Sequence, residues 1–509
     1  MNKTKQISSG VLVGILSGCL LTPVHAATNN NIEANLARLE KEVASLKKQV
    51  NAKKTNTKTV APPTNAASVT AAKNQKKVDT VQAVDDGNLH FQQYLPFDPD
   101  VPGQAYVSSG PYVGVKIQFA GNNLIVNSPS VNTDLQLLVI RKNIINQLNA
   151  TLGESGIQPT HSHVLLSGVI EGQANYTNHG GAPSTTDIDV TNVSLDTTIL
   201  GPSDWLLGYV ELSYNNNAPI GDVFVSTSNY RVSNSRVYVN KAFVTIGNLT
   251  CSPFYFTFGQ FYAPFGTYST VMVSDPLTRL MARTKVRALQ LGFAQQSDNA
   301  FYASAYIFRG DSHENSVAKV RNGGINIGYK FDLGFLTGNI GGGVIANIAD
   351  SGGMQFGVNF QEFEQLVHRV PAYDLRAAFN IGQHLDLIAE YIVASSRFSP
   401  LDMSFNNHGA KPGALDLEAA FSFSLFDRPS SIGIGYGNAN QLLAMELPNT
   451  RKFIVFNTSW WRNTLQSLEF RVDRQYASSA VATGAGGFEV EPQEGKLDRA
   501  ITAQFDYYF

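Results

Sequence analysis

The C-terminal segment of the chain shows the clearest alternation of apolar and polar positions. Every second residue is apolar or aromatic, namely Ile501, Ala503, Phe505, Tyr507 and Phe509. The residues between them are mostly polar, namely Thr502, Gln504, Asp506 and Tyr508. A period of two places these sets on opposite faces of one β-strand. The segment therefore predicts a strand with one apolar face and one polar face.

The same alternation recurs upstream, and there the polar face carries charges. Such charged positions are Asp374, Arg376, Asp386, Glu390, Asp416 and Glu418. Charges repeated on one face of several strands are unfavourable in the dry core of a sandwich, but a water-filled lumen tolerates them. The pattern favours a transmembrane β-barrel.

Segments of this texture run from about residue 163 to the C-terminus. There are about sixteen, near 163–173, 191–199, 205–214, 236–246, 253–260, 287–295, 300–308, 323–332, 335–346, 371–380, 384–393, 414–424, 430–438, 451–460, 465–474 and 499–509. Short connections, expected in the periplasm, alternate with long ones, expected outside the cell. We therefore predict an all-β fold, a transmembrane antiparallel barrel of about 16 strands over residues 161–509.

The N-terminus reads as a secretory signal peptide over residues 1–26. Lys3 and Lys5 precede an apolar core, and Val24-His25-Ala26 offers a cleavage site. A lipoprotein-type signal that acylates Cys19 is the alternative.

Residues 30–51 have apolar positions spaced alternately four and three apart. These are Ile32, Leu36, Leu39, Val43, Leu46 and Val50, the seam of a coiled-coil helix. The seam predicts either self-association or packing of one helix on the barrel. Residues 52–86 read as a flexible linker. Residues 87–160 contain an expected strand at 112–119 and a helix or mixed element at 135–148, and we expect them to form a plug or a periplasmic segment.

Composition excludes several classes of protein. The net charge of −2 argues against nucleic acid as a partner, and no apolar stretch beyond the N-terminus reaches the length of a transmembrane helix. No catalytic constellation or cofactor motif stands out, so we expect neither an enzyme nor a bound cofactor. His161 and His163 lack further candidate metal ligands, and Cys251 is expected to be a small buried residue.

The densest basic cluster of the barrel is the candidate ligand-binding site. It comprises Arg279, Arg283, Lys285 and Arg287. A helix would align the three arginines, whereas an extended chain would point all four side chains the same way. The cluster is either a solvated edge that contacts lipopolysaccharide or an anion site in the lumen.

Two resemblances sharpen these expectations. Phe505, Tyr507 and the terminal Phe509 resemble the signal that the outer-membrane barrel assembly machinery reads. The coiled coil and the Asn127-Ser128-Pro129-Ser130 segment resemble the outer-membrane siderophore and iron uptake proteins typified by the legiobactin receptor and by the FslE and FupA proteins. That resemblance implies uptake of a ferric siderophore without the TonB-coupled architecture, whose barrels have about 22 strands.

Three functions follow as hypotheses. The first is an outer-membrane importer of a ferric, polycarboxylate-type siderophore, with the N-terminal region in the periplasm. The second is a general diffusion porin for anions. The third is a structural tether, in which the coiled coil meets a partner or forms a homo-oligomer.

Overall fold

A computed structural model describes residues 106–109, 132–152, 163–180, 183–201, 203–215, 236–297, 299–314, 319–382, 384–461, 463–490 and 496–509. The expected signal peptide, coiled coil, linker and strand at 112–119 lie outside the described residues. Within those residues, no helix combines the length and apolar character needed to cross a membrane.

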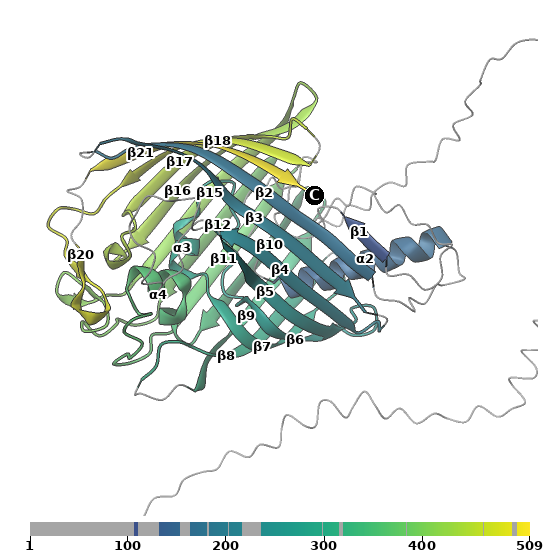
Figure 1. Ribbon diagram of the computed structural model, residues 1–509, viewed down its shortest axis with the longest axis horizontal. Helices are drawn as coiled ribbons and strands as arrows, with labels where there is room; N and C mark the ends of the chain where they lie inside the picture. Colours follow the sequence, from purple (N-terminus) through teal and green to yellow (C-terminus); the bar gives the residue numbers. More distant parts are fainter. Residues whose placement is uncertain are drawn as a thin grey trace, which may run out of the picture. The chain divides into compact units, whose positions relative to one another are not determined.

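Sixteen antiparallel strands close into a barrel (Figure 1). They are β2 (His163–Asn178), β3 (Thr185–Leu200), β4 (Leu206–Asn215), β5 (Arg236–Gly247), β6 (Phe254–Tyr262), β7 (Lys285–Ala294), β8 (Ala300–Arg309), β9 (Val320–Asp332), β10 (Leu336–Ile345), β11 (Ala372–Ile381), β12 (Leu385–Ala394), β15 (Gly413–Leu425), β16 (Arg428–Asn440), β17 (Thr450–Thr458), β18 (Thr464–Arg474) and β21 (Leu497–Tyr508). The predicted strand number is confirmed, although β2 ends five residues later and β3 begins six residues earlier than expected.

Pairing between the first and last strands closes the barrel. β21 lies against β2 from Val169↔Tyr508 to Asn178↔Arg499. The terminal Phe509 adds two backbone bonds, because Gly168 N donates to its carbonyl at 2.8 Å and its own N–H donates to the Gly168 carbonyl at 3.1 Å. The first residues of β2, which precede its ladder with β21, pair instead with the short parallel strand β1 (Tyr106–Ser109).

Alternation along each strand separates an apolar exterior from a polar lumen. On β21, Ile501, Phe505 and Tyr507 are 43–45% exposed on the outer face, whereas Gln504 and Asp506 are buried on the inner face. β11, β12 and β15 follow the same rule with the charged residues expected from their sequence. The apolar exterior is what a barrel presents to lipid.

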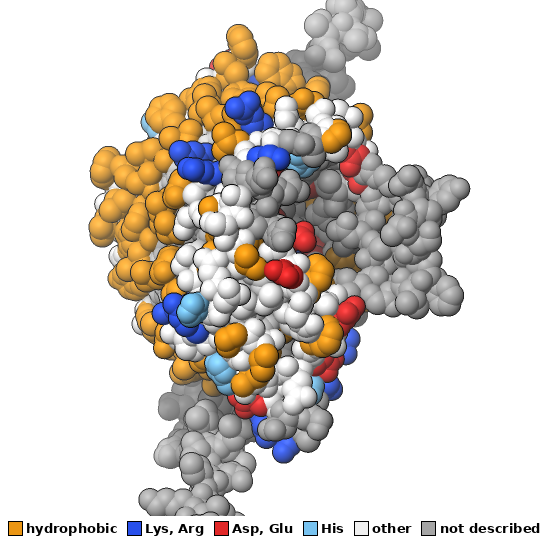
Figure 2. All heavy atoms as spheres, turned by 90° about the vertical axis from the view of Figure 1, so that its left-hand side faces the viewer, with side chains coloured by type: hydrophobic (Ala, Val, Ile, Leu, Met, Phe, Trp, Pro, Cys, Tyr) orange, Lys and Arg blue, Asp and Glu red, His pale blue; other side chains and the backbone are white. Residues whose placement is uncertain are grey.

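The two ends of the barrel differ. One end, the turn end, has brief connections such as 333–335 and 426–427, and exposed aromatic side chains surround it: Trp205, Phe254, Phe335, Phe426, Trp460 and Trp461. The other end, the loop end, carries the connections 263–284, 310–319, 346–371, 395–412, 441–449 and 475–496. Figure 2 looks onto the loop end, where polar side chains cover most of the face and hydrophobic ones gather on the flank.

The long loops contain short elements and share an apolar core. These elements are α3 (Leu277–Ala282), η2 (Ile348–Asp350), α4 (Gly352–Gly357), β13 (Ser404–Phe405), β14 (His408–Gly409), η3 (Leu443–Met445), β19 (Ala482–Thr483), η4 (Ala485–Gly487) and β20 (Glu489–Val490). β14, β13, β19 and β20 form a separate small sheet. Met281, Met354, Phe360 and Leu442 are fully buried in the core, so the loops form one packed layer.

Helix α2 (Thr133–Leu152) occupies part of the lumen near the turn end. Leu137, Leu138 and Ile140 are buried among wall residues. The Asp134 carboxylate accepts hydrogen bonds from Thr257 Oγ1 at 2.9 Å and Gln290 Nε2 at 2.8 Å. The helix lies in the segment expected to be a plug, and the plug role remains a prediction.

Deletion of Phe509 tests the closing pair. The deletion removes two backbone hydrogen bonds at the seam and one ring of the outer aromatic face. We expect a severalfold loss of heat-modifiable, folded barrel from outer membranes. Phe488→Ala, which removes an exposed ring from a loop, is the control. An unchanged yield of folded barrel after the deletion would contradict the prediction.

Candidate functional site

The connection between β6 and β7, residues 263–284, lies inside the barrel. It begins with a tight turn at Gly266, whose φ of +79° suits glycine, and a Cβ there would meet the Tyr268 ring at 2.6 Å. The chain then follows the inner wall from β12 to β18 and ends in α3. We call residues 263–284 the inner loop.

Carboxylates on three wall strands hold the backbone of the inner loop. Glu390 of β12 accepts from Thr267 N at 2.6 Å, and Glu418 of β15 accepts from Val271 N at 2.7 Å. Glu469 of β18 accepts from Val273 N at 2.7 Å. Buried backbone N–H groups need such partners, and each hydrogen bond contributes about 0.5–1.5 kcal/mol. The wall therefore fixes the path of the loop.

Packing adds to these polar contacts. Val271, Met272 and Val273 form a buried apolar cluster with wall residues Ile388, Ala420, Phe453 and Val455. Glycines on the inner face of β16 make room for the loop: a Cβ at Gly433 would meet Val271 at 2.6 Å, and one at Gly437 would meet Leu277 at 3.1 Å. The inner loop therefore lies directly against this wall.

A cavity of about 310 Å³ lies between the inner loop and the adjoining wall. Its lining is mostly polar and neutral, with one arginine and one aspartate: Gln173, Asn175, Thr177, Thr185, Asp187, Val273, Ser274, Arg471, Ala500 and Thr502. The wall residues come from β2, β3, β18 and β21, so the cavity lies beside the closing seam. Such a lining can hydrogen-bond to a hydrophilic solute.

Two arginines lie at the β18 side of this cavity. Arg451 binds Asp473 with two hydrogen bonds of 2.9 Å, and Arg471 Nε approaches the same carboxylate at 3.1 Å. Two guanidinium groups thus share one carboxylate. Arg471 also lines the cavity, where its terminal N–H groups can meet the carboxylate or phosphate of a solute.

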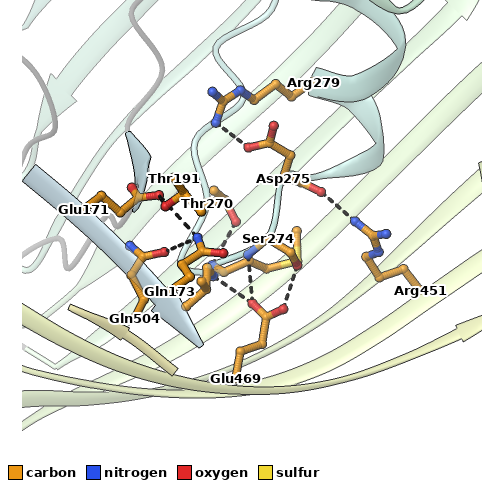
Figure 3. Close-up of polar contacts among 12 residues, drawn as sticks. Glu171, Gln173, Thr191, Thr270, Ser274, Asp275, Arg279, Arg451, Glu469 and Gln504 are labelled. Carbon is orange, nitrogen blue, oxygen red and sulfur yellow. Dashed lines mark hydrogen bonds and ion pairs between the residues drawn. The ribbon is translucent and has the colours of Figure 1, made fainter. Parts of the chain in front are cut away.

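Carboxylates lie on the seam side of the same region (Figure 3). Glu171 of β2 accepts hydrogen bonds from Thr191 and from Gln173, the latter at 3.2 Å, and Gln173 also bonds Gln504 at 2.7 Å. Arg451 reaches the inner loop by donating to the Asp275 carbonyl at 2.7 Å. Charges of both signs therefore stand around the cavity.

The predicted basic cluster is divided by the fold. Arg279 lies in α3 and pairs with Asp275 at 2.5 Å, and burial lowers the pKa of its guanidinium while Asp275 opposes that shift. Arg283 lies over the Tyr262 ring at 4.8 Å. Lys285 and Arg287 belong to β7 and are exposed on the outer face. Neither expected arrangement, three arginines along one helix face or four side chains on one side of an extended chain, is present. The reason is that α3 ends at Ala282 and β7 begins at Lys285.

Sequence reasoning missed other members of the site. The alternation put Glu390 and Glu418 on the lumen face, but nothing in it indicated that they bind a loop backbone. Arg451 and Arg471 were not predicted as site residues, since each stands in an ordinary strand pattern. Cys251, expected to be buried, is exposed. The described residues contain no group of His, Cys, Asp and Glu suited to a metal.

These features define the class of the protein. A closed barrel of 16 strands with an apolar exterior, a polar lumen and an inner loop is an outer-membrane β-barrel of the porin-like kind. The chain belongs to the UPF0422 family. It is 36% identical over 408 residues to a UPF0422 protein of Coxiella burnetii, which covers 79% of this chain and 84% of the relative. A UPF0422 protein of Legionella pneumophila strain Lens is 36% identical over 424 residues, 79% of this chain and 76% of the relative.

Solved structures with a similar barrel include an anion-selective porin from Comamonas acidovorans, with a TM-score of 0.45 and 11% identity over 69% of this chain and all of the porin. Another is the outer-membrane channel DcaP of Acinetobacter baumannii, with a TM-score of 0.43 and 13% identity over 69% of this chain and 98% of the channel. No family model matches the chain. The family shown is UPF0422, so the resemblance to siderophore uptake proteins stays a prediction.

Replacing Glu418 and Glu469 together by Ala tests the anchoring of the inner loop. The change leaves several loop N–H groups without their acceptors, at about 1–3 kcal/mol each. We expect the folded barrel to become cleavable by trypsin after Arg279 or Arg283. Glu446→Ala, an exposed loop carboxylate, serves as the control. A folded double variant that resists trypsin as the wild type does would show that packing alone holds the loop.

Proposed function

We propose that the protein is an outer-membrane channel that admits small hydrophilic solutes, with a preference for anions. The observation that carries the proposal is the cavity of about 310 Å³ beside the inner loop, lined by hydrogen-bonding side chains and by Arg471. The inner loop narrows the lumen, so a solute passes close to these groups. The two arginines that share Asp473 supply the positive charge that favours anions.

We also propose which end of the barrel faces the periplasm. Both ends of the barrel chain, His163 and Tyr508, lie at the turn end. Long loops at the outside and short turns at the periplasm are the arrangement typical of outer-membrane barrels. Solutes would therefore meet the loop layer first and α2 last.

Arg471→Gln tests the anion preference. Losing this charge leaves Arg451 and Asp473 as a balanced pair and removes the one cation among the residues that line the cavity. In planar bilayers with a salt gradient, we expect the reversal potential to shift toward cation selectivity. Arg428→Gln, at an exposed turn, changes the net charge equally and should leave the potential unchanged. Equal selectivity of wild type and Arg471→Gln would overturn the proposal for anions.

Ferric siderophore import is the second candidate, and the family resemblance favours it. A ferric polycarboxylate is bulky relative to a cavity of about 310 Å³, so its passage would require α2 to leave the lumen. A disulfide between Asp134→Cys and Thr257→Cys, in a Cys251→Ser background, replaces a hydrogen-bonded pair and should hold the helix in place.

The measurement is uptake of labelled siderophore by iron-limited cells that carry the crosslinked variant. If a siderophore is the cargo, uptake should fall severalfold and return when a reductant opens the bridge. The parent Cys251→Ser chain is the control. Wild-type uptake with the bridge closed, or normal uptake in a deletion strain, would exclude this cargo route.

A further inference from the structure

Basic side chains stand on the outer face of the barrel near the loop end. They alternate with inward residues on their strands and are all exposed: Lys285, Arg287, Arg309, Arg321, Lys452, Arg474 and Arg499. Figure 2 shows basic side chains at the border between the polar end face and the hydrophobic flank. These seven residues include the two members of the predicted cluster that point away from the lumen.

Strand pairing gathers four of them into a first arc on β7, β8 and β9. The ladder of β7 and β8 ends at Ala288↔Phe308, so Arg287 and Arg309 are the next residues on the two strands. Arg309 in turn pairs with Val320, next to Arg321. Three arginines therefore follow one another across adjacent strands.

A second arc lies on β17, β18 and β21. Lys452 and Arg499 both pair with Val472 of the intervening strand, one from each side. Arg474 follows two residues further toward the loop end on the same outer face. Three cations again surround a single apolar residue.

Among the residues that the structure describes, no ion pair balances these cations. In the described part of the chain, none of the seven forms an ion pair with a carboxylate on the outer face, and Arg287 donates only to the neutral amide of Gln260 at 3.2 Å. Like charges on neighbouring strands are destabilising, so the arcs need an external anion.

The position of the first arc indicates which kind of anion it binds. Directly toward the turn end, the outer face becomes aliphatic, with Leu289, Ile307 and Ile325 about half exposed. The cations therefore lie where hydrocarbon contact ends, at the level of lipid headgroups. Arginine binds phosphate oxygens with paired hydrogen bonds.

We propose that the two arcs bind the phosphate groups of a phosphorylated glycolipid, the chemistry of lipopolysaccharide, in the leaflet that surrounds the loop end. The turn end, with its aromatic rim, then lies in the opposite leaflet. This binding surface is independent of the lumen and of the channel function. Near the loop end, its two arcs leave the strands from β10 to β16 without basic residues among the described outward positions.

The test uses the purified full chain in an uncharged detergent, titrated with bisphosphorylated lipid A and, separately, with dephosphorylated lipid A. We expect wild type to bind the phosphorylated form at least about tenfold more tightly. The triple variant Arg287→Gln, Arg309→Gln and Arg321→Gln should lose most of that preference, while changing the same three residues to Lys should retain part of it. Arg428→Gln, at the turn end, should bind as the wild type does.

Any of three outcomes would overturn the proposal. The first is equal binding of the two lipid forms by the wild-type chain, a comparison that needs no variant to fold. The second is wild-type affinity in a folded triple Gln variant, verified by heat modifiability. The third is strong competition by inorganic phosphate at matched concentration, which would show that the arcs bind free phosphate rather than lipid.

Discussion

Closure of the sheet between β21 and β2 is the constraint on which the rest of this structure depends. A strand in hydrocarbon cannot leave its backbone groups unpaired, so the chain must return its last strand to its first. The ladder from Val169↔Tyr508 to Asn178↔Arg499 does so, and the terminal Phe509 extends it by two bonds. Once the barrel is closed, alternation assigns every second side chain to the lumen.

That assignment places many carboxylates in the lumen, and some of them accept hydrogen bonds from the inner loop. Glu390, Glu418 and Glu469 stand on three strands of one wall and accept backbone N–H groups from the loop. The same wall provides glycines on β16 where the loop approaches closely. Beside the loop, a cavity lies next to Arg471 of β18 and the closing seam.

Tertiary contacts decide the environment and the partners of each arginine. Arg451 and Arg471 share the carboxylate of Asp473, and Arg471 also lines the cavity. Arg279 is neutralised by Asp275 inside the lumen, whereas Arg287 stands outside beside Arg309. Four basic residues within nine positions of sequence thus serve different environments, because a helix ends and a strand begins between them.

The sequence by itself determined the strand number, the faces of strands such as β11, β15 and β21, and the alternation of short turns with long loops. These features are local, since a period of two and a turn signal need no distant partner. Only the tertiary structure decided that residues 263–284 fold inward, that α2 enters the lumen, and that the predicted basic cluster divides. Each of these depends on contacts across the barrel, such as Glu469 with Val273, whose partners are nearly two hundred residues apart and leave no periodic trace in the sequence.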